Sequence, residues 1–262
     1  MELGLRGRTA VVTGASKGIG RAIAAALAAE GVRLAICART SADIERAAHE
    51  ISQASGVDVH PLAVDLANAE GVDRFVSFAL ERLGHVDILV NNAGAIPGGT
   101  LEGLDEDTWR RSYELKLWSY VRLTRAFLPG MRERRSGAIL HIIGNAGRQP
   151  SPGYIAGGIA NAGLMNFTKA LAMEAGRYGV RVNAINPGPI RTERQAALIA
   201  TQAHTRGISP DEVEQETARS IPLGRIGRPE EVAAAAVFLV SDAASFITGI
   251  TLPVEGGLTA TI

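Results

Sequence analysis

Short runs of β-branched and aliphatic residues alternate with longer stretches in which apolar residues recur at helical spacing, nearly from end to end of the chain. Regular alternation of strands and helices implies right-handed crossovers, so the pattern predicts a doubly wound parallel sheet covered by helices on both faces. We expect about seven strands. They are Thr9–Thr13, Arg33–Cys37, Val57–Val64, Ile88–Asn91, Ala138–Ile143, Val180–Asn186 and Thr251–Val254.

Nothing in the sequence divides the chain into parts. Its 262 residues suit one large domain or two small ones, and there is no repeat, low-complexity tract or linker. We therefore predict a single domain over residues 1–262. One stretch departs from the pattern: Arg191–Pro222 is polar, with broken helical periodicity. It is either a mobile flap over a pocket or an ordinary surface excursion, at about residues 191–222.

Composition excludes several classes of protein. Hydrophobic residues make up 46% of the chain and 27 basic residues balance 27 acidic ones, so neither disorder nor a global attraction to nucleic acid or membrane is expected. The single cysteine, Cys37, cannot form an internal disulfide, which favours the cytoplasm, and no targeting or membrane segment is expected. Cys37 and His141 are predicted to be buried. The scattered histidines lack metal-ligand spacing, so no metal is expected.

A glycine-rich segment follows the first predicted strand. Residues 13–20 read Thr-Gly-Ala-Ser-Lys-Gly-Ile-Gly and lead into a helix. Glycines there permit a tight turn and let the backbone approach a pyrophosphate at the helix N-terminus. The spacing is neither that of the commonest dinucleotide fingerprint nor that of a P-loop. Taken alone, the segment is also compatible with a plain strand-to-helix turn.

Three further motifs stand at the carboxyl ends of predicted strands, where open α/β sheets bind ligands. They are Asp65-Leu66, Asn91-Asn92-Ala93-Gly94 and Pro187-Gly188-Pro189-Ile190-Arg191-Thr192. With the glycine-rich segment, and with Gly227-Arg228-Pro229-Glu230-Glu231-Val232 near the end, they make the whole chain resemble the short-chain dehydrogenase/reductase family. The resemblance implies a Rossmann-like fold and a bound nicotinamide dinucleotide.

The resemblance also assigns roles to the cofactor-binding residues. The pyrophosphate would be held by Gly14, Ser16, Gly18, Ile19 and Gly20. Asp65 and Leu66 would contact the adenine, while Asn92, Ala93 and Gly94 would line the adenosine and its ribose. The nicotinamide amide would be received by Pro187, Gly188, Ile190 and Thr192.

The end of the second predicted strand bears on the choice of dinucleotide. A carboxylate there would accept hydrogen bonds from a ribose 2′-hydroxyl and repel a 2′-phosphate. Ala38 takes that place and Arg39 follows, while Lys17 adds a second positive charge from the glycine-rich segment. A guanidinium can bind a phosphate with two hydrogen bonds. We therefore expect NADP(H) in preference to NAD(H).

The catalytic pattern of the family is not reproduced. The family uses a tyrosine with a lysine four residues later, a serine, and an asparagine on the preceding helix. A gapless comparison places Gly157, Asn161, Gly144 and Lys116 at those four positions. Lysine and asparagine have thus exchanged places. Alternatively, an insertion puts Tyr154 in the tyrosine position, with Gly158 where the lysine belongs.

We hypothesise that Tyr154, one helical turn before Gly157, donates and accepts the proton, and that the glycines 157 and 158 leave room for it. Lys116 would be the cation that eases its ionisation. Asn161 would contact the ribose or a water, and Asn145 is a candidate for orienting the substrate. Otherwise Tyr154 merely caps a helix and Lys116 is a solvated side chain. Arg194 is either a contact for a polar substrate or part of an exposed loop.

These observations predict an NADP(H)-dependent oxidoreductase that transfers a hydride between nicotinamide and a small or medium carbonyl or secondary alcohol. The resemblance further implies a homo-oligomer, a dimer or a tetramer, built through the helices that carry Lys116 and Asn161 and through the C-terminal strand. The substituted residues leave two alternatives open. One is a catalytically impaired dinucleotide-binding sensor or scaffold, and the other is a different reaction on the same scaffold, such as epimerisation or elimination.

Overall fold

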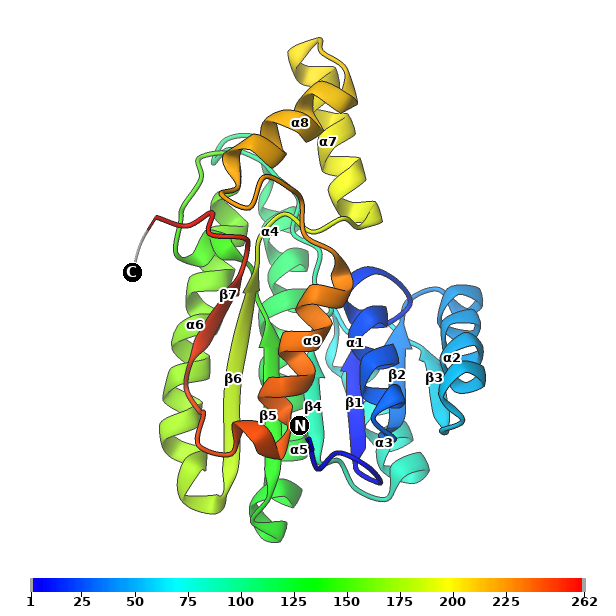
Figure 1. Cartoon of the computed structure of the whole chain (residues 1–262). Helices are drawn as coiled ribbons and strands as arrows, with labels where there is room; N and C mark the ends of the chain where they lie inside the picture. The colour runs from blue at the N-terminus through cyan, green and yellow to red at the C-terminus, as the bar shows by residue number, and fades with distance from the viewer. Residues whose placement is uncertain (1, 261–262) are drawn as a thin grey trace.

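The β-sheet forms the centre of the molecule. A computed structural model describes residues 2–260 and contains a seven-stranded parallel sheet of order β3-β2-β1-β4-β5-β6-β7 (Figure 1). The strands are β1 (Thr9–Thr13), β2 (Arg33–Ala38), β3 (Val59–Ala63), β4 (Ile88–Asn91), β5 (Gly137–Ile142), β6 (Val180–Pro187) and β7 (Thr251–Val254). The doubly wound α/β fold predicted from the alternating pattern is confirmed. The edge strand β3 is shorter at both ends than the strand predicted at Val57–Val64.

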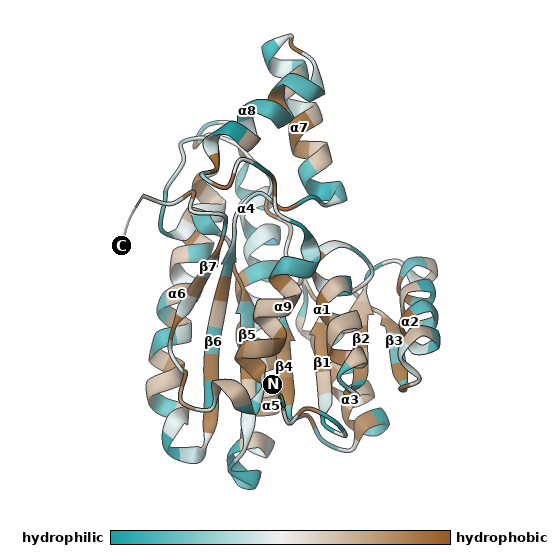
Figure 2. Ribbon diagram, in the orientation of Figure 1, coloured by the Kyte–Doolittle hydropathy of each residue, from teal (hydrophilic) through white to brown (hydrophobic). Residues whose placement is uncertain are grey.

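Helices cover both faces of the sheet. One face carries α1 (Gly18–Ala29), α2 (Ser41–Ser55) and α9 (Pro229–Val240), and the other carries α3 (Ala69–Leu83), α5 (Ser119–Arg134) and α6 (Ile155–Ala175). Successive strand residues point to opposite faces, so Val11 packs under α3 and α5 while Val12 packs under α1 and α9. Figure 2 shows the resulting concentration of hydrophobic residues along the central strands.

The order of the strands reverses between β1 and β4. The chain runs outward from β1 through β2 to β3, then returns to β4 on the other side of β1. Both strands are parallel neighbours, with Val11 opposite Leu89. Because all the strands run in one direction, their carboxyl ends meet at a single edge of the sheet, and a crevice forms where the order reverses. The motifs that follow β1, β4 and β6 all reach this edge.

The stretch at about residues 191–222 is helical, which corrects the prediction of broken helical patterning. It forms α7 (Glu193–Arg206) and α8 (Pro210–Ser220), which project beyond the sheet (Figure 1). The two helices share a small apolar cluster that includes Ile199, Ala203 and Val213. Each helix buries only one or two apolar side chains, so the stretch as a whole is polar in sequence.

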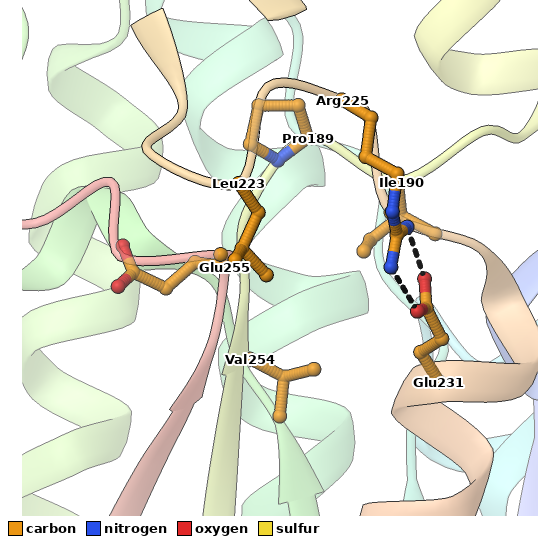
Figure 3. A pocket seen from close by; sticks show the side chains of 9 residues that line it. Pro189, Ile190, Leu223, Arg225, Glu231, Val254 and Glu255 are labelled. Carbon is orange, nitrogen blue, oxygen red and sulfur yellow. Dashed lines mark hydrogen bonds and ion pairs between the residues drawn. The ribbon is translucent and has the colours of Figure 1, made fainter.

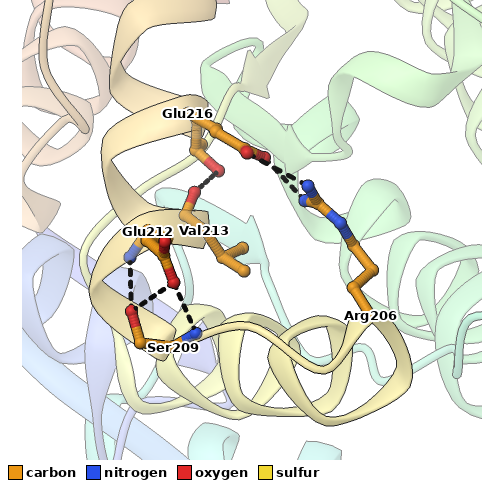
Figure 4. Close-up of polar contacts among 6 residues, drawn as sticks. Arg206, Ser209, Glu212, Val213 and Glu216 are labelled. Carbon is orange, nitrogen blue, oxygen red and sulfur yellow. Dashed lines mark hydrogen bonds and ion pairs between the residues drawn. The ribbon is translucent and has the colours of Figure 1, made fainter.

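Local hydrogen bonds define the ends of these two helices. The Thr192 side chain caps the start of α7, and Gly207 ends it in the left-handed conformation. Ser209 and Glu212 form a reciprocal capping box at the start of α8. Arg206 makes two hydrogen bonds to Glu216, which join the helices (Figure 4). We refer to α7 and α8 together as the α7–α8 hairpin.

Two buried residues expected from the sequence are confirmed. Cys37 in β2 is fully buried, and burial raises the pKa of its thiol, so the thiol stays protonated and unreactive. His141 in β5 stacks on Phe167, and its Nδ1 lies 3.0 Å from the Thr168 hydroxyl. Burial lowers the pKa of His141 to about 3, so the imidazole is neutral. Within residues 2–260, no helix has the length and apolar character needed to cross a membrane.

Candidate functional site

The glycine-rich segment makes a tight turn between β1 and α1. Gly14 has a φ of +64°, and a Cβ on it would lie 3.0 Å from the Ala93 Cα. A Cβ on Gly20 would lie 2.3 Å from the Gly14 carbonyl oxygen, so only glycine fits there. Lys17 precedes α1 without a side-chain cap, which leaves the first amide groups of the helix available to an anion. The turn therefore has the shape and the donors of a pyrophosphate cradle.

Hydrogen bonds tie this turn to the segment after β4. The Thr13 hydroxyl accepts from the backbone amides of Asn92 (2.9 Å) and Ala93 (3.0 Å). The Asn92 amide group donates in turn to the carbonyl oxygens of Thr13 (2.9 Å) and Gly14 (3.1 Å). The two motifs thus form one rigid unit across the β1–β4 crevice. Asn92 supports the backbone of the cradle, a role additional to the one implied by the resemblance.

Other predicted cofactor residues lie along the same edge. Leu66 is buried and Asp65 exposed after β3, and Arg39 is exposed directly after β2. The segment after β6 is held by a hydrogen bond from the Gly188 amide to the Val254 carbonyl (3.0 Å). Thr192 reaches the glycine-rich segment, since a Cβ on Gly18 would lie 3.2 Å from its methyl group. These residues fit an extended dinucleotide that crosses the sheet edge.

A polar cavity of about 410 Å³ adjoins the start of α1. It is lined by Ser16 and by three cations, each of which forms an ion pair with a carboxylate. The pairs are Lys17 with Glu193, Arg21 with Glu50, and Arg46 with Asp43. All six side chains are at least one-third exposed, so each pair is weak and open to exchange with a phosphate. This arrangement suits an anionic group beside Lys17.

A second cavity of about 110 Å³ lies between the turn after β6 and the end of β7 (Figure 3). Pro189, Ile190, Leu223 and Val254 line it, and Arg225 forms an ion pair with Glu231 at one side (2.6 Å). Ligand pockets usually enclose roughly 300 Å³ or more. This cavity is too small for a substrate, and it belongs to the support of the turn.

Tyr154 lies in the space that a side chain at position 157 would take. It immediately precedes α6, and a Cβ on Gly157 would lie 1.9 Å from its Cε1 atom and 2.1 Å from its Cζ atom. The backbone of Tyr154 is fixed by hydrogen bonds from its amide to the Ser151 carbonyl and from the Gly158 amide to its own carbonyl. The Tyr154 ring therefore occupies the space beside Gly157 that a side chain at that position would fill.

Lys116 is buried at the middle of a π-helical turn, Glu114–Trp118, between α4 (Glu106–Tyr113) and α5. Such turns are common at functional sites because they change the direction of side chains. Its Nζ donates to the Ile143 carbonyl (2.5 Å), and Gly94 leaves room for its side-chain carbons. Burial, and then the positive charge of Arg194, lower the pKa of Lys116 from 10.5 to about 7. Lys116 is not a solvated surface lysine.

Asn161 is buried in α6 and contacts the residue that follows Ile143. A Cβ on Gly144 would lie 3.0 Å from the Asn161 Nδ2 atom. The Oδ1 atom of Asn161 is buried, and it has no hydrogen-bond partner among the residues that the structure describes. A buried acceptor without a donor is costly. A ribose hydroxyl or a water would satisfy it, which fits the role predicted for Asn161.

Asn145 is held by the segment after β7. Its Nδ2 donates to Glu255 (3.4 Å), and its Oδ1 accepts from the Thr259 hydroxyl (2.8 Å). Both ends of the amide are therefore engaged within the protein. The geometry favours a structural role for Asn145, namely linking the loop after β5 to the end of the chain.

Arg194, in the first turn of α7, is the residue whose role the sequence does not decide. The structure shows that its Nη2 donates to the Tyr154 hydroxyl (3.2 Å) and to the Ile96 carbonyl (2.9 Å), and its Nη1 donates to the Gly94 carbonyl (3.3 Å). The sequence signal is a basic residue two positions after the motif that follows β6. Forty residues separate it from Tyr154, so spacing alone could not pair them.

Known proteins resemble the chain over its whole length. A family profile described as enoyl-(acyl carrier protein) reductase matches residues 14–259. A 3-oxoacyl-[acyl-carrier-protein] reductase of Vibrio cholerae is 37% identical over 259 residues, which cover 98% of this chain and 99% of that protein. Among solved structures, L-sorbose reductase from Gluconobacter frateurii, complexed with NADPH and L-sorbose, has a TM-score of 0.95 and 37% identity, with 100% of each chain covered. A variant of actinorhodin polyketide ketoreductase with NADPH has a TM-score of 0.93 and 33% identity, covering 97% of this chain and 98% of that one.

Proposed function

The chain belongs to the short-chain dehydrogenase/reductase family, and we propose that this NADP(H)-dependent oxidoreductase reduces a ketone to a secondary alcohol with Tyr154 as its proton donor. The observation that carries the role of Tyr154 is the position of its ring over Gly157. A phenol held there replaces the side chain that the family places on the helix. In the opposite direction the same group accepts the proton of the alcohol.

The residues at the sheet edge fit the cofactor. The amides at the start of α1 would hold the pyrophosphate, while Arg39 and Lys17 would meet the 2′-phosphate. The Oδ1 atom of Asn161 would accept a hydrogen bond from the nicotinamide ribose. When bound, the nicotinamide supplies the hydride that is added to the carbonyl carbon.

The protein supplies the proton. The Tyr154 Oη–H bond breaks as a new O–H bond forms on the substrate oxygen, so the phenol is left as a phenolate. A positioned proton donor of this kind contributes typically about 10²- to 10⁴-fold to the rate. Lys116 exchanges protons close to neutral pH because its pKa is lowered to about 7. In this proposal the charged form of Lys116, held on the Ile143 carbonyl, is a cation that favours ionisation of the phenol.

A ketone is the functional group shared by the substrates that the relatives' names contain. One relative is named for a 3-oxoacyl group, and a solved structure holds the ketose L-sorbose. Both compounds present a carbonyl carbon that becomes a secondary alcohol. We infer a small or medium-sized ketone as the substrate, with the loop after β5 and the α7–α8 hairpin forming the walls of its pocket.

We also infer that the chain works in the cytoplasm as a homo-oligomer, most simply a tetramer. Large apolar side chains are exposed on the elements that carry Lys116 and Asn161, with 48% of Trp118, 54% of Ile159 and 75% of Met173 accessible. Contact between copies would cover this surface. Light scattering on the purified protein tests this inference, and a monomer at micromolar concentration would contradict it.

The decisive test of the reaction follows NADPH oxidation with a panel of β-ketoacyl thioesters, ketoses and cyclic ketones. The Y154F variant keeps the ring over Gly157 and loses only the hydroxyl. We expect kcat to fall by about 10²-fold or more, with NADPH binding unchanged. Tight binding of NADPH without turnover of any ketone would favour a dinucleotide sensor, and full activity of Y154F would exclude Tyr154 as the donor.

A further inference from the structure

We propose that Arg194 is the positioning residue of Tyr154, and that its guanidinium orients the phenol and stabilises the phenolate that proton donation leaves behind. This inference rests on the proposed function, in which Tyr154 is the proton donor. It assigns to the first turn of α7 a task that the family pattern gives to a lysine on α6.

The guanidinium is held in place before it meets the phenol. Two backbone carbonyls of the segment after β4, those of Gly94 and Ile96, accept from its two terminal nitrogens at 3.3 and 2.9 Å. Arginine presents its donors in a rigid planar fork, so two fixed contacts determine the direction of the rest. The remaining donor of Nη2 points at the Tyr154 hydroxyl, 3.2 Å away.

Tyr154 needs such a partner because it stands outside the helix. It is the residue before α6, with φ −147° and ψ 40°. The absence of a side chain at Gly157 leaves space for the Tyr154 ring, but Gly157 offers the Tyr154 hydroxyl no hydrogen bond. The Lys116 Nζ donates to the Ile143 carbonyl. Arg194 is the cationic side chain that donates a hydrogen bond to the Tyr154 hydroxyl.

The charge of arginine suits this position. When the Tyr154 Oη–H proton passes to the substrate oxygen, the electron pair of that bond remains on Oη as a negative charge. A guanidinium within hydrogen-bond distance stabilises this charge, and it does not give up its own proton at any working pH. The same positive charge contributes, after burial, to the lowered pKa of Lys116. Arg194 therefore acts on both candidate proton-transfer groups.

Neighbouring residues connect this contact to the cofactor cradle. Thr192 lies against Gly18 and Glu193 forms an ion pair with Lys17, while Arg194 binds Tyr154. Three consecutive residues at the start of α7 therefore span from the pyrophosphate turn to the phenol. The orientation of the phenol therefore depends on the position of the first turn of α7 relative to the glycine-rich segment.

The test compares R194A, R194K and Y154F, with R206A as the control. R206A removes the hydrogen bonds that join α7 to α8 and leaves Tyr154 untouched, so it measures the effect of loosening the hairpin alone. A hydrogen bond to a charged group is worth roughly 1.5–3 kcal/mol, so we expect R194A to lower kcat by about 10- to 100-fold. KM for NADPH should change little. R194K should recover part of kcat, and added guanidinium ion should partly rescue R194A.

A double variant separates this inference from the proposed function. In the Y154F background, R194A should lower kcat no further, because the contact is already lost. If Y154F lowers kcat but R194A does not, the positioning role is wrong and the donor role stands. If R206A lowers kcat as much as R194A, the effect belongs to the hairpin and the inference is overturned. If Y154F keeps parental activity, the proposed donor itself fails.

Discussion

Lys116 and Asn161 reach consecutive residues at the end of β5 from two different helical segments. The ammonium of Lys116 donates to the Ile143 carbonyl, and the amide of Asn161 lies against Gly144. The sequence had suggested that these two residue types exchanged positions relative to the family. The ammonium and the amide thus lie at the same short piece of backbone, although they come from different helical segments.

Replacing Lys116 should change how stability depends on pH. Burial lowers the pKa of Lys116 from 10.5 to about 7 in the folded protein. From about pH 7 upward to the ordinary lysine pKa, the unfolded chain binds more protons than the folded chain, so the free energy of unfolding rises with pH. Relative to K116M, the parent should gain about 2 kcal/mol between about pH 7 and pH 9. Urea unfolding at several pH values measures this, and parallel curves for the two proteins would contradict the burial of the ammonium.

A methyl group at position 157 should disable the site. In G157A the new Cβ would overlap the Tyr154 ring, so the ring must move away from α6. We expect kcat to fall by about 10²-fold, as for loss of the proton donor. G163A is the matched control, since it lies on the same helix with no atom within 4 Å of a Cβ. It should stabilise α6 by about 0.5–1 kcal/mol and retain activity. Parental kcat in G157A would argue against a catalytic Tyr154.

Arg39 should determine the preference for NADPH. It is exposed at the end of β2, where Ala38 offers no carboxylate to a ribose hydroxyl. In R39A, KM for NADPH should rise about 10-fold or more, because a charge-assisted hydrogen bond to phosphate is lost. KM for NADH should remain unchanged, which provides an internal control. Equal effects on both cofactors would place Arg39 outside the 2′-phosphate site.

Removing the cap of α8 should loosen the hairpin locally. The Ser209 hydroxyl accepts from the Glu212 amide (3.2 Å), and the Glu212 carboxylate accepts from the Ser209 amide (2.8 Å). S209A should destabilise α8 by about 1 kcal/mol. Hydrogen exchange of the first-turn amides, measured by mass spectrometry, should be faster there and unchanged in α1. Unaltered exchange would show that packing of Val213 alone maintains the helix.

The fold was predictable because its central strands are buried on both faces. Such strands carry continuous apolar runs, and β1 and β4 have the bounds expected from them. The strand predicted at 57–64 is longer than β3, which lies at the sheet edge and is half-buried throughout. The mixed polar and apolar sequence there does not define where the strand ends.

The α7–α8 hairpin was missed because its two helices bury few residues, namely Ile199 and Ala203 in α7 and Val213 in α8. The stronger signals were at the ends, in the cap residues Thr192, Gly207 and Ser209. The cofactor motifs were predictable because they are local in sequence. The contact between Arg194 and Tyr154 was not, since it depends on the three-dimensional course of the chain between β5 and α7.

Gly144 limits how this site can change over evolution. Its φ is +131°, which side chains of L-amino acids rarely adopt, and a Cβ there would press on the Asn161 amide. A serine introduced at 144 would press on the Asn161 amide, and a tyrosine introduced at 157 would overlap the Tyr154 ring. A tolerated change at either position is therefore expected to need a second change in the residue that the new side chain would press on. A lineage carrying this set of residues is expected to keep it as a block.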